Sequence, residues 1–250
     1  MLFHEFGSQE APVILCLHGM LQDWKTEYDF VKPLEKDFRL ILPAMDGMYL
    51  DSPEFTTFAE QCRQMEEYIV THHSGHIHGV YGCSQGATVL SELLARNKVQ
   101  VNIAVFDGIY LAHQGNVAAW FGYKVFSKVK ENGGKFPKAM DVVMKLMGLG
   151  KEDYQMFEAL YWDVSDISMK NNLYENYNFH VNPDIQSTRT KIHLWCGEKE
   201  PYAIKSHKIL KKYLKNYEEI IFENMGHGQM LMKKNEEYME ILRQTFAKAQ

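Results

Sequence analysis

The sequence predicts an α/β fold in which a mostly parallel β-sheet is flanked by helices. Short apolar runs alternate with amphipathic segments along most of the chain. Each apolar run has the length of a strand buried on both faces, and the segments between the runs have helical periodicity. Because parallel strands need crossover connections, this alternation favours helices on both faces of the sheet.

Six apolar runs are expected to form buried strands: PVILCLHG, FRLILPA, HIHGVYG, VNIAVFDG, KIHLWCGE and EEIIFEN. Apolar residues recur at helical spacing from Phe58 to Ile69, and Thr57 with Glu60 before them resembles a capping box. A second apolar face over residues 231–246 predicts a C-terminal helix.

One region interrupts the alternation. Residues 113–187 contain no clear strand pattern and are rich in aromatic residues and methionine. We therefore expect a helical insertion, a cap or lid, between two parts of one core formed by residues 1–112 and 188–250.

Composition narrows the classes of function. The 250 residues are 46% hydrophobic and 24% charged, with a net charge of −5, as in an ordinary globular protein. No basic tract indicates nucleic-acid binding, and neither a signal peptide nor a membrane span is expected. Four cysteines without a CxxC pair suit a reduced, cytoplasmic protein. A homodimer remains open.

The segment Gly82-Cys83-Ser84-Gln85-Gly86 matches G-x-S-x-G between a predicted strand and a predicted helix. In that context the serine lies on a sharp turn, and the helix N-terminus favours developing negative charge beside it. Ser84 is therefore the predicted nucleophile. Cys83 is the alternative, but we expect it to pack beneath the turn.

A serine hydroxyl needs a base, and a third group must orient that base. Among eleven histidines, His227 lies in MGHGQ after the last predicted strand, which makes it the predicted base. Glu200 in CGEKEP is the favoured acid because it follows the penultimate strand. Asp107 in VFDG is the alternative acid, and Glu198 is a weaker third choice.

Acyl transfer also needs donors for an oxyanion. The backbone N–H of Gln85, next to the nucleophile, is one predicted donor, and that of Met20 in LCLHGM is the other. His18 beside it is expected to be a structural loop residue.

Together LHGM, GCSQG, GEKEP and MGHG, in this order, resemble the α/β-hydrolase superfamily, in particular its small capped carboxylesterases and acyl hydrolases. The resemblance covers nearly the whole chain. It implies the α/β-hydrolase fold, a triad of Ser84, His227 and Glu200, and an oxyanion hole at Met20 and Gln85. The acid is most often aspartate in that superfamily, and its usual first strands are here reduced to LFHEFG.

We expect Met20, Trp120, Trp162 and Met45 to contact the substrate, since methionine and aromatic side chains suit an apolar pocket. No cofactor is expected, because G-x-G-x-x-G and phosphate-binding loops are missing from the sequence. The histidines of THHSGHIHG lack a metalloprotease spacing, so no catalytic metal is expected either.

The leading hypothesis is a serine hydrolase that cleaves a carboxylic ester or thioester with an apolar portion through an acyl-enzyme. Its partner is then a small molecule with an apolar acyl or alcohol group. Acyltransferase, amidase and carbon–carbon bond hydrolase activities remain alternatives that use the same residues. A non-catalytic member of the fold that binds small ligands is a further alternative.

Overall fold

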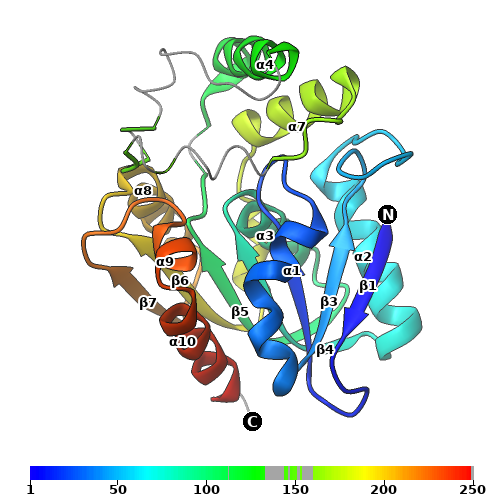
Figure 1. Cartoon of the computed structure of the whole chain (residues 1–250). Coiled ribbons are helices and arrows are strands. Elements are labelled where there is room, and N and C mark those ends of the chain that lie inside the picture. The colour runs from blue at the N-terminus through cyan, green and yellow to red at the C-terminus, as the bar shows by residue number, and fades with distance from the viewer. Residues whose placement is uncertain (112, 133–143, 146, 151–152, 154–159, 249–250) are drawn as a thin grey trace.

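The computed structural model describes residues 1–111, 113–132, 144–145, 147–150, 153 and 160–248. Its centre is a seven-stranded sheet in the order β1-β3-β2-β4-β5-β6-β7 (Figure 1). The strands are β1 Leu2–Phe6, β2 Val13–Leu17, β3 Arg39–Ala44, β4 His76–Cys83, β5 Gln100–Asp107, β6 Lys191–Gly197 and β7 Tyr217–Phe222. Only β1 pairs antiparallel, with β3, and the other neighbours are parallel.

All six predicted buried strands are present, and the LFHEFG run forms the edge strand β1. Five of them, from β2 to β6, are almost completely buried, which explains their continuous apolar runs. The prediction that the last strand is buried is wrong, because β7 is the outer strand of the sheet and Phe222 is its one buried residue. The predicted fold class is confirmed.

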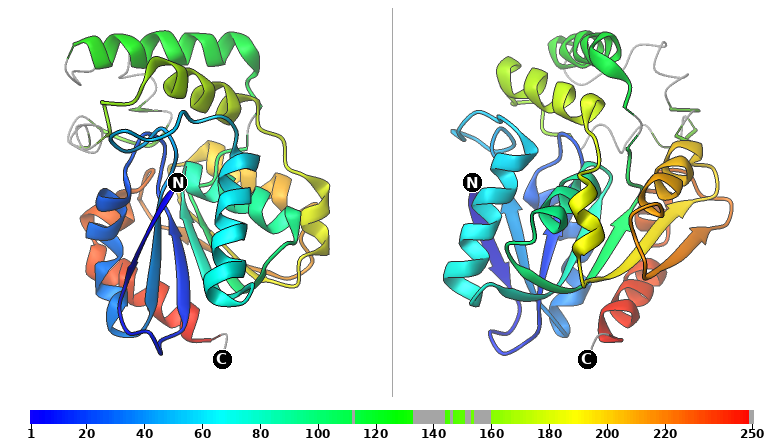
Figure 2. Two further views of the ribbon diagram at one scale, coloured as in Figure 1. Left: turned by 90° about the vertical axis from the view of Figure 1, so that its right-hand side faces the viewer. Right: turned by 180° about the vertical axis from the view of Figure 1, so that it is seen from behind.

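Helices cover both faces of the sheet, as the edge-on view shows (Figure 2). One face packs against α2 Phe58–His73, α3 Gln85–Arg96 and α8 Pro201–Leu210. The other packs against α1 Trp24–Val31, the short helix η1 Lys32–Lys36, α9 Gln229–Lys233 and α10 Asn235–Ala247. Each face therefore has its own hydrophobic core.

Two local predictions need correction. The apolar face predicted over residues 231–246 belongs to two helices, because Lys234 leaves the helical conformation with φ −136° and ψ 46° between α9 and α10. At the start of α2 only half of the capping box forms. The Thr57 hydroxyl accepts a hydrogen bond from the Glu60 N–H, but the Glu60 carboxylate binds Arg63 instead of reaching back.

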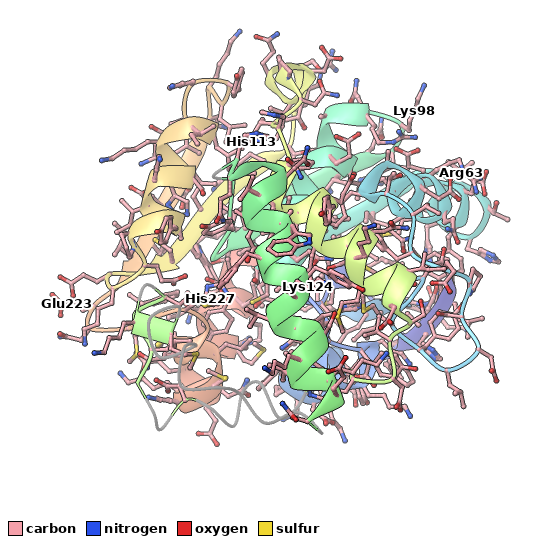
Figure 3. The ribbon with its side chains drawn as sticks, turned by 90° about the horizontal axis from the view of Figure 1, so that it is seen from above. Arg63, Lys98, His113, Lys124, Glu223 and His227 are labelled. Carbon is pink, nitrogen blue, oxygen red and sulfur yellow. The ribbon has the colours of Figure 1, made fainter. Side chains whose placement is uncertain are left out.

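The predicted insertion over residues 113–187 includes α4 Gly115–Glu131, α7 Asp166–Asn178 and the short helix η3 Pro183–Ser187. Residues 133–143, 146, 151–152 and 154–159 of this prediction lie outside the described part. Helices α4 and α7 pack together and lie over the edge of the sheet where the parallel strands end (Figures 1 and 3). They are therefore close to the loops that carry the predicted site residues.

Within the described ranges, no helix has the length and apolar character needed to cross a bilayer.

Candidate active site

The turn between β4 and α3 holds Ser84 in an unusual backbone conformation, with φ 55° and ψ −116°. The N–H of Ser84 donates a hydrogen bond to the backbone oxygen of Asp107, at the end of the neighbouring strand, over 2.7 Å. A Cβ at Gly86 would lie 2.1 Å from the backbone oxygen of Leu17. Glycine is therefore required two residues after Ser84, because β2 and the turn approach each other so closely.

Three predicted side chains from distant parts of the chain meet at this turn. His227 Nε2 lies 3.0 Å from Ser84 Oγ, and His227 Nδ1 lies 2.6 Å from Glu200 Oε2. A carboxylate can only accept, so Nδ1 carries the proton and Nε2 is free to accept from the Ser84 hydroxyl. The result is a continuous hydrogen-bonded chain from carboxylate to imidazole to hydroxyl.

Hydrogen bonds to the backbone fix the positions of both Glu200 and His227. It follows β6 and directly precedes α8, is 4% exposed, and its Oε1 accepts a hydrogen bond of 2.5 Å from the N–H of Gly197. His227 lies in the loop after β7, and its own N–H donates to the backbone oxygen of Met147 at 2.9 Å. Both ring nitrogens and the backbone of His227 are therefore fixed.

The charge of Glu200 also changes the basicity of His227. Burial lowers the pKa of this histidine, but the adjacent Glu200 carboxylate, with a smaller contribution from Asp107, outweighs burial and raises the pKa above its usual 6.5. The imidazole is consequently a better proton acceptor than a free histidine.

The alternative acids have other contacts. Asp107 Oδ2 accepts a hydrogen bond of 2.7 Å from the hydroxyl of Tyr238, and burial together with the charge of Glu200 raises the pKa of Asp107 to about 7. Glu198 is exposed and accepts from the N–H of Asn224. Of the three candidate acids, Glu200 is the one that the structure places against His227.

The remaining sequence candidates near the turn are buried. Cys83 is 8% exposed, and burial raises the pKa of its thiol far above 9.0, which disfavours a thiolate. His18 is 1% exposed, and its Nδ1 donates to the backbone oxygen of Gly19 at 3.0 Å.

The two predicted oxyanion donors, Met20 and Gln85, both line the cavity in front of Ser84. Gln85 is the first residue of α3, so its N–H has no acceptor within its own helix and is available to a ligand. The positive end of the helix dipole lies at the same position.

Solved structures share this architecture over almost the whole chain. A protein from Desulfitobacterium hafniense assigned to the α/β-hydrolase family matches with a TM-score of 0.83 and 19% identity, over 97% of this chain and 99% of that one. The chain has the α/β-hydrolase fold. A carboxylesterase from Nitrososphaera gargenis matches with a TM-score of 0.77 and 15% identity, over 99% and 94% of the two chains. An esterase from Exiguobacterium antarcticum has the same TM-score and identity, over 98% and 94%.

No family model matches the sequence, and the search of curated proteins gives no significant match. The structural matches establish the α/β-hydrolase fold. Because one fold supports many reactions, the activity has to be inferred from the residues of the site.

In this α/β-hydrolase fold the larger cavity at Ser84 has a volume of about 220 Å³. Its described walls include Met20, Phe126, Met147, Tyr110, Tyr177 and Tyr202. Ser84, Glu200 and His227 also line it, so the hydrogen-bonded chain opens into a largely apolar space.

The structure brings one of the four predicted substrate contacts, Met20, to this cavity. Trp120 on α4 is 52% exposed, Trp162 packs beside the core near Phe126, and Met45 is buried in the core. None of these three is among the described residues that line the cavity. The reason is that composition identifies apolar side chains but does not show which way each one points.

Sequence reasoning missed a polar network behind His227. Gln229 Oε1 accepts from the N–H of Gly226 at 2.8 Å, and Gln229 Nε2 donates to Asp153 Oδ2 at 2.7 Å. Lys233 Nζ lies 2.7 Å from Asp153 Oδ1. This network joins the histidine loop to the predicted insertion. The MGHGQ motif contained Gln229, but nothing in the pattern pointed to its partner.

Proposed function

We propose that the protein is a serine hydrolase that cleaves a carboxylic ester or thioester with an apolar portion. The observation that carries this proposal is the hydrogen-bonded chain from Glu200 through His227 to Ser84, which opens into an apolar cavity. The esterases among the structural neighbours add support at the level of the fold.

In the first half of the reaction, Ser84 Oγ attacks the substrate carbonyl while His227 Nε2 takes the hydroxyl proton. The charge of Glu200 stabilises the resulting imidazolium. The N–H groups of Met20 and Gln85 receive the oxyanion. The tetrahedral intermediate collapses, the bond to the alcohol or thiol breaks, and His227 returns its proton to that leaving group.

In the second half, water enters the place of the leaving group. His227 takes a proton from the water, and the hydroxide attacks the acyl carbon on Ser84. The second intermediate collapses, the carboxylic acid leaves, and the proton returns to Ser84 Oγ. The hydrogen bonds from Glu200 to His227 and from His227 to Ser84, together with the positions of Met20 and Gln85 at the cavity wall, support this sequence of steps.

The test compares the wild type with Ser84→Ala and Cys83→Ala. We expect the wild type to hydrolyse p-nitrophenyl butanoate and to take up one fluorophosphonate group, located on Ser84 by mass spectrometry. Ser84→Ala should lose both properties, whereas Cys83→Ala should keep the label. Labelling that persists in Ser84→Ala, or a wild type that neither reacts with the probe nor turns over the ester, contradicts the proposal.

A further inference from the structure

A second, smaller cavity of about 80 Å³ adjoins Ser84 and His227. Besides Ser84 and His227, it shares Met20, Phe126 and Met147 with the larger cavity, and its other described walls differ. They include residues of α1, of the loop before it, of the turn around Cys83 and of the segment that follows His227. The reacting carbon of an ester held at Ser84 would therefore have room on two sides.

The side chain of Glu27 on α1 lines this smaller cavity. It is 1% exposed, and its Oε1 is buried without a hydrogen-bond partner. Among the described residues, Glu27 has neither a side-chain hydrogen bond nor an ion pair. Val31, one helical turn further along, packs on the same buried face of α1. Burying an apolar side chain at the position of Glu27 would cost less free energy than burying a carboxyl group.

Carboxyl groups predominate around Glu27. The described residues that line the two cavities include Glu27 and Glu200, no lysine or arginine is among them, and their basic side chain is that of His227, which already pairs with Glu200. Asp107 is buried close by. Burial, followed by the charge of Asp107, raises the pKa of Glu27 to about 8. A cation in the cavity would supply the missing partner and restore the ionised form, because an opposite charge favours it.

We propose that the smaller cavity is a subsite for an ammonium group on the substrate, with Glu27 as its counter-ion. This rests on the proposed function, since it places the ammonium on a short arm of the ester that Ser84 attacks. A volume of about 80 Å³ is roughly that of two or three water molecules, so the arm is only a few atoms long. The larger cavity receives the apolar part.

The test uses two pairs of esters, each with a cationic and a neutral member of the same shape. The acyl pair is the β-alanyl and butanoyl p-nitrophenyl esters. The alcohol pair is the butanoates of 3-dimethylaminopropanol and 4-methylpentanol. In at least one pair we expect kcat/KM to be tenfold or more higher for the cationic ester, and Glu27→Gln to bring this ratio close to one.

Asp29→Asn is the matched control, because it removes the same charge from an exposed position on the same helix. It should keep the wild-type ratio. Ratios near one in both pairs for the wild type, or a preference that survives in Glu27→Gln, overturn the proposal.

The absence of the ammonium subsite and the absence of serine hydrolase activity give different experimental results. Without serine hydrolase activity, neither neutral ester is turned over and the fluorophosphonate does not label Ser84. The subsite is then tested by the melting temperature of Ser84→Ala with propylammonium chloride, against sodium chloride at equal ionic strength. A saturable rise that Glu27→Gln abolishes supports the ammonium site, and no rise overturns it.

Discussion

At the scale of single residues, the contact between Glu200 and His227 has two effects. The 2.6 Å hydrogen bond fixes the tautomer of the imidazole, and the carboxylate charge raises the pKa of His227 above its usual value. The base acts only when it is neutral, so the rate should rise with pH through the pKa of His227. Loss of the Glu200 charge should lower that pKa.

We therefore predict that Glu200→Gln lowers kcat/KM for a p-nitrophenyl ester by ~10⁴ and moves the acidic limb of the pH profile to lower pH. Asp107→Asn should have a smaller effect, because Asp107 hydrogen-bonds Tyr238 rather than the base. Rate measurements across pH 5 to 9 on both variants check this. An equal or larger loss in Asp107→Asn would reverse the assignment of the acid.

Glu27 gives a second prediction at this scale. Its pKa is about 8 in the folded protein and 4.5 in an exposed glutamate. Between these values the unfolded chain has released the proton that the folded chain keeps, so stability falls as pH rises, by about 1.4 kcal/mol per pH unit. Glu27→Gln removes this loss.

The free energy of unfolding of Glu27→Gln should therefore exceed that of the wild type by an amount that grows from pH 5 to pH 8. Urea unfolding at the two pH values measures it, with Asp29→Asn as the exposed control. A difference that does not change with pH would mean that Glu27 is already ionised in the folded protein.

At the scale of elements, the turn between β4 and α3 depends on the absence of a side chain at Gly86. We predict that Gly86→Ala costs more than ~3 kcal/mol of stability and removes most of the activity, because the new Cβ meets the backbone of β2. Gly75→Ala is the matched control. Its Cβ would lie 3.8 Å from the nearest side chain, so only the strain of a positive φ remains, about 1–2 kcal/mol. If thermal unfolding shows the same loss of stability for Gly86→Ala and Gly75→Ala, the backbone of β2 moves away from the new Cβ at Gly86.

The loop of His227 is held by another element-scale contact, the hydrogen bonds of Gln229 to Gly226 and Asp153. Gln229→Ala leaves the buried N–H of Gly226 without its acceptor and removes one of the two hydrogen bonds that Asp153 Oδ2 accepts, since the N–H of Gly150 still donates to it. The substitution should cost ~1–3 kcal/mol in urea unfolding. It should also lower kcat by on the order of tenfold, since even a small displacement of His227 from the Ser84 hydroxyl slows proton transfer. Gln244 is an exposed glutamine on α10 whose side chain hydrogen-bonds Glu240, and Gln244→Ala should change neither value. A stability loss with an unchanged kcat would make Gln229 purely structural.

At the scale of the whole molecule, the parallel sheet explains why the site can form at all. Ser84 and His227 are 143 positions apart, and Glu200 and His227 are 27 apart. Each follows a strand, and parallel strands end at one edge, so the loops after β4, β6 and β7 meet there. Helices α4 and α7 then lie over that edge (Figure 3).

The four cysteines report on the whole fold, because buried thiols react with a reagent only where the structure opens. All four are free and buried, and burial raises the pKa of each above 9.0. We predict that 5,5′-dithiobis(2-nitrobenzoate) reacts with four thiols per chain in denaturant and with none quickly in native buffer. Fast native labelling, located by mass spectrometry, would identify a region that opens.

The strands and the turn at Ser84 could be predicted from the sequence because their signals are local. A continuous apolar run and a glycine-flanked serine report their own surroundings. The placement of Trp120, Trp162 and Met45 could not be predicted. The direction in which each of these side chains points depends on the segments that pack against it, which the local sequence does not show. The break between α9 and α10 at Lys234 could not be predicted either. Apolar residues on both sides of Lys234 pack into the same hydrophobic core, so their pattern resembles that of one continuous helix.

The sequence alone determined the order of the strands along the chain and two of the residues that meet at the site, Ser84 and His227, since these follow from periodicity and from short motifs. Only the tertiary structure decided that Glu200 rather than Asp107 contacts His227, that Gln229 joins the loop to Asp153, and that Glu27 lines a cavity without a partner. These are distances between segments far apart in the chain, and packing sets them rather than any local preference.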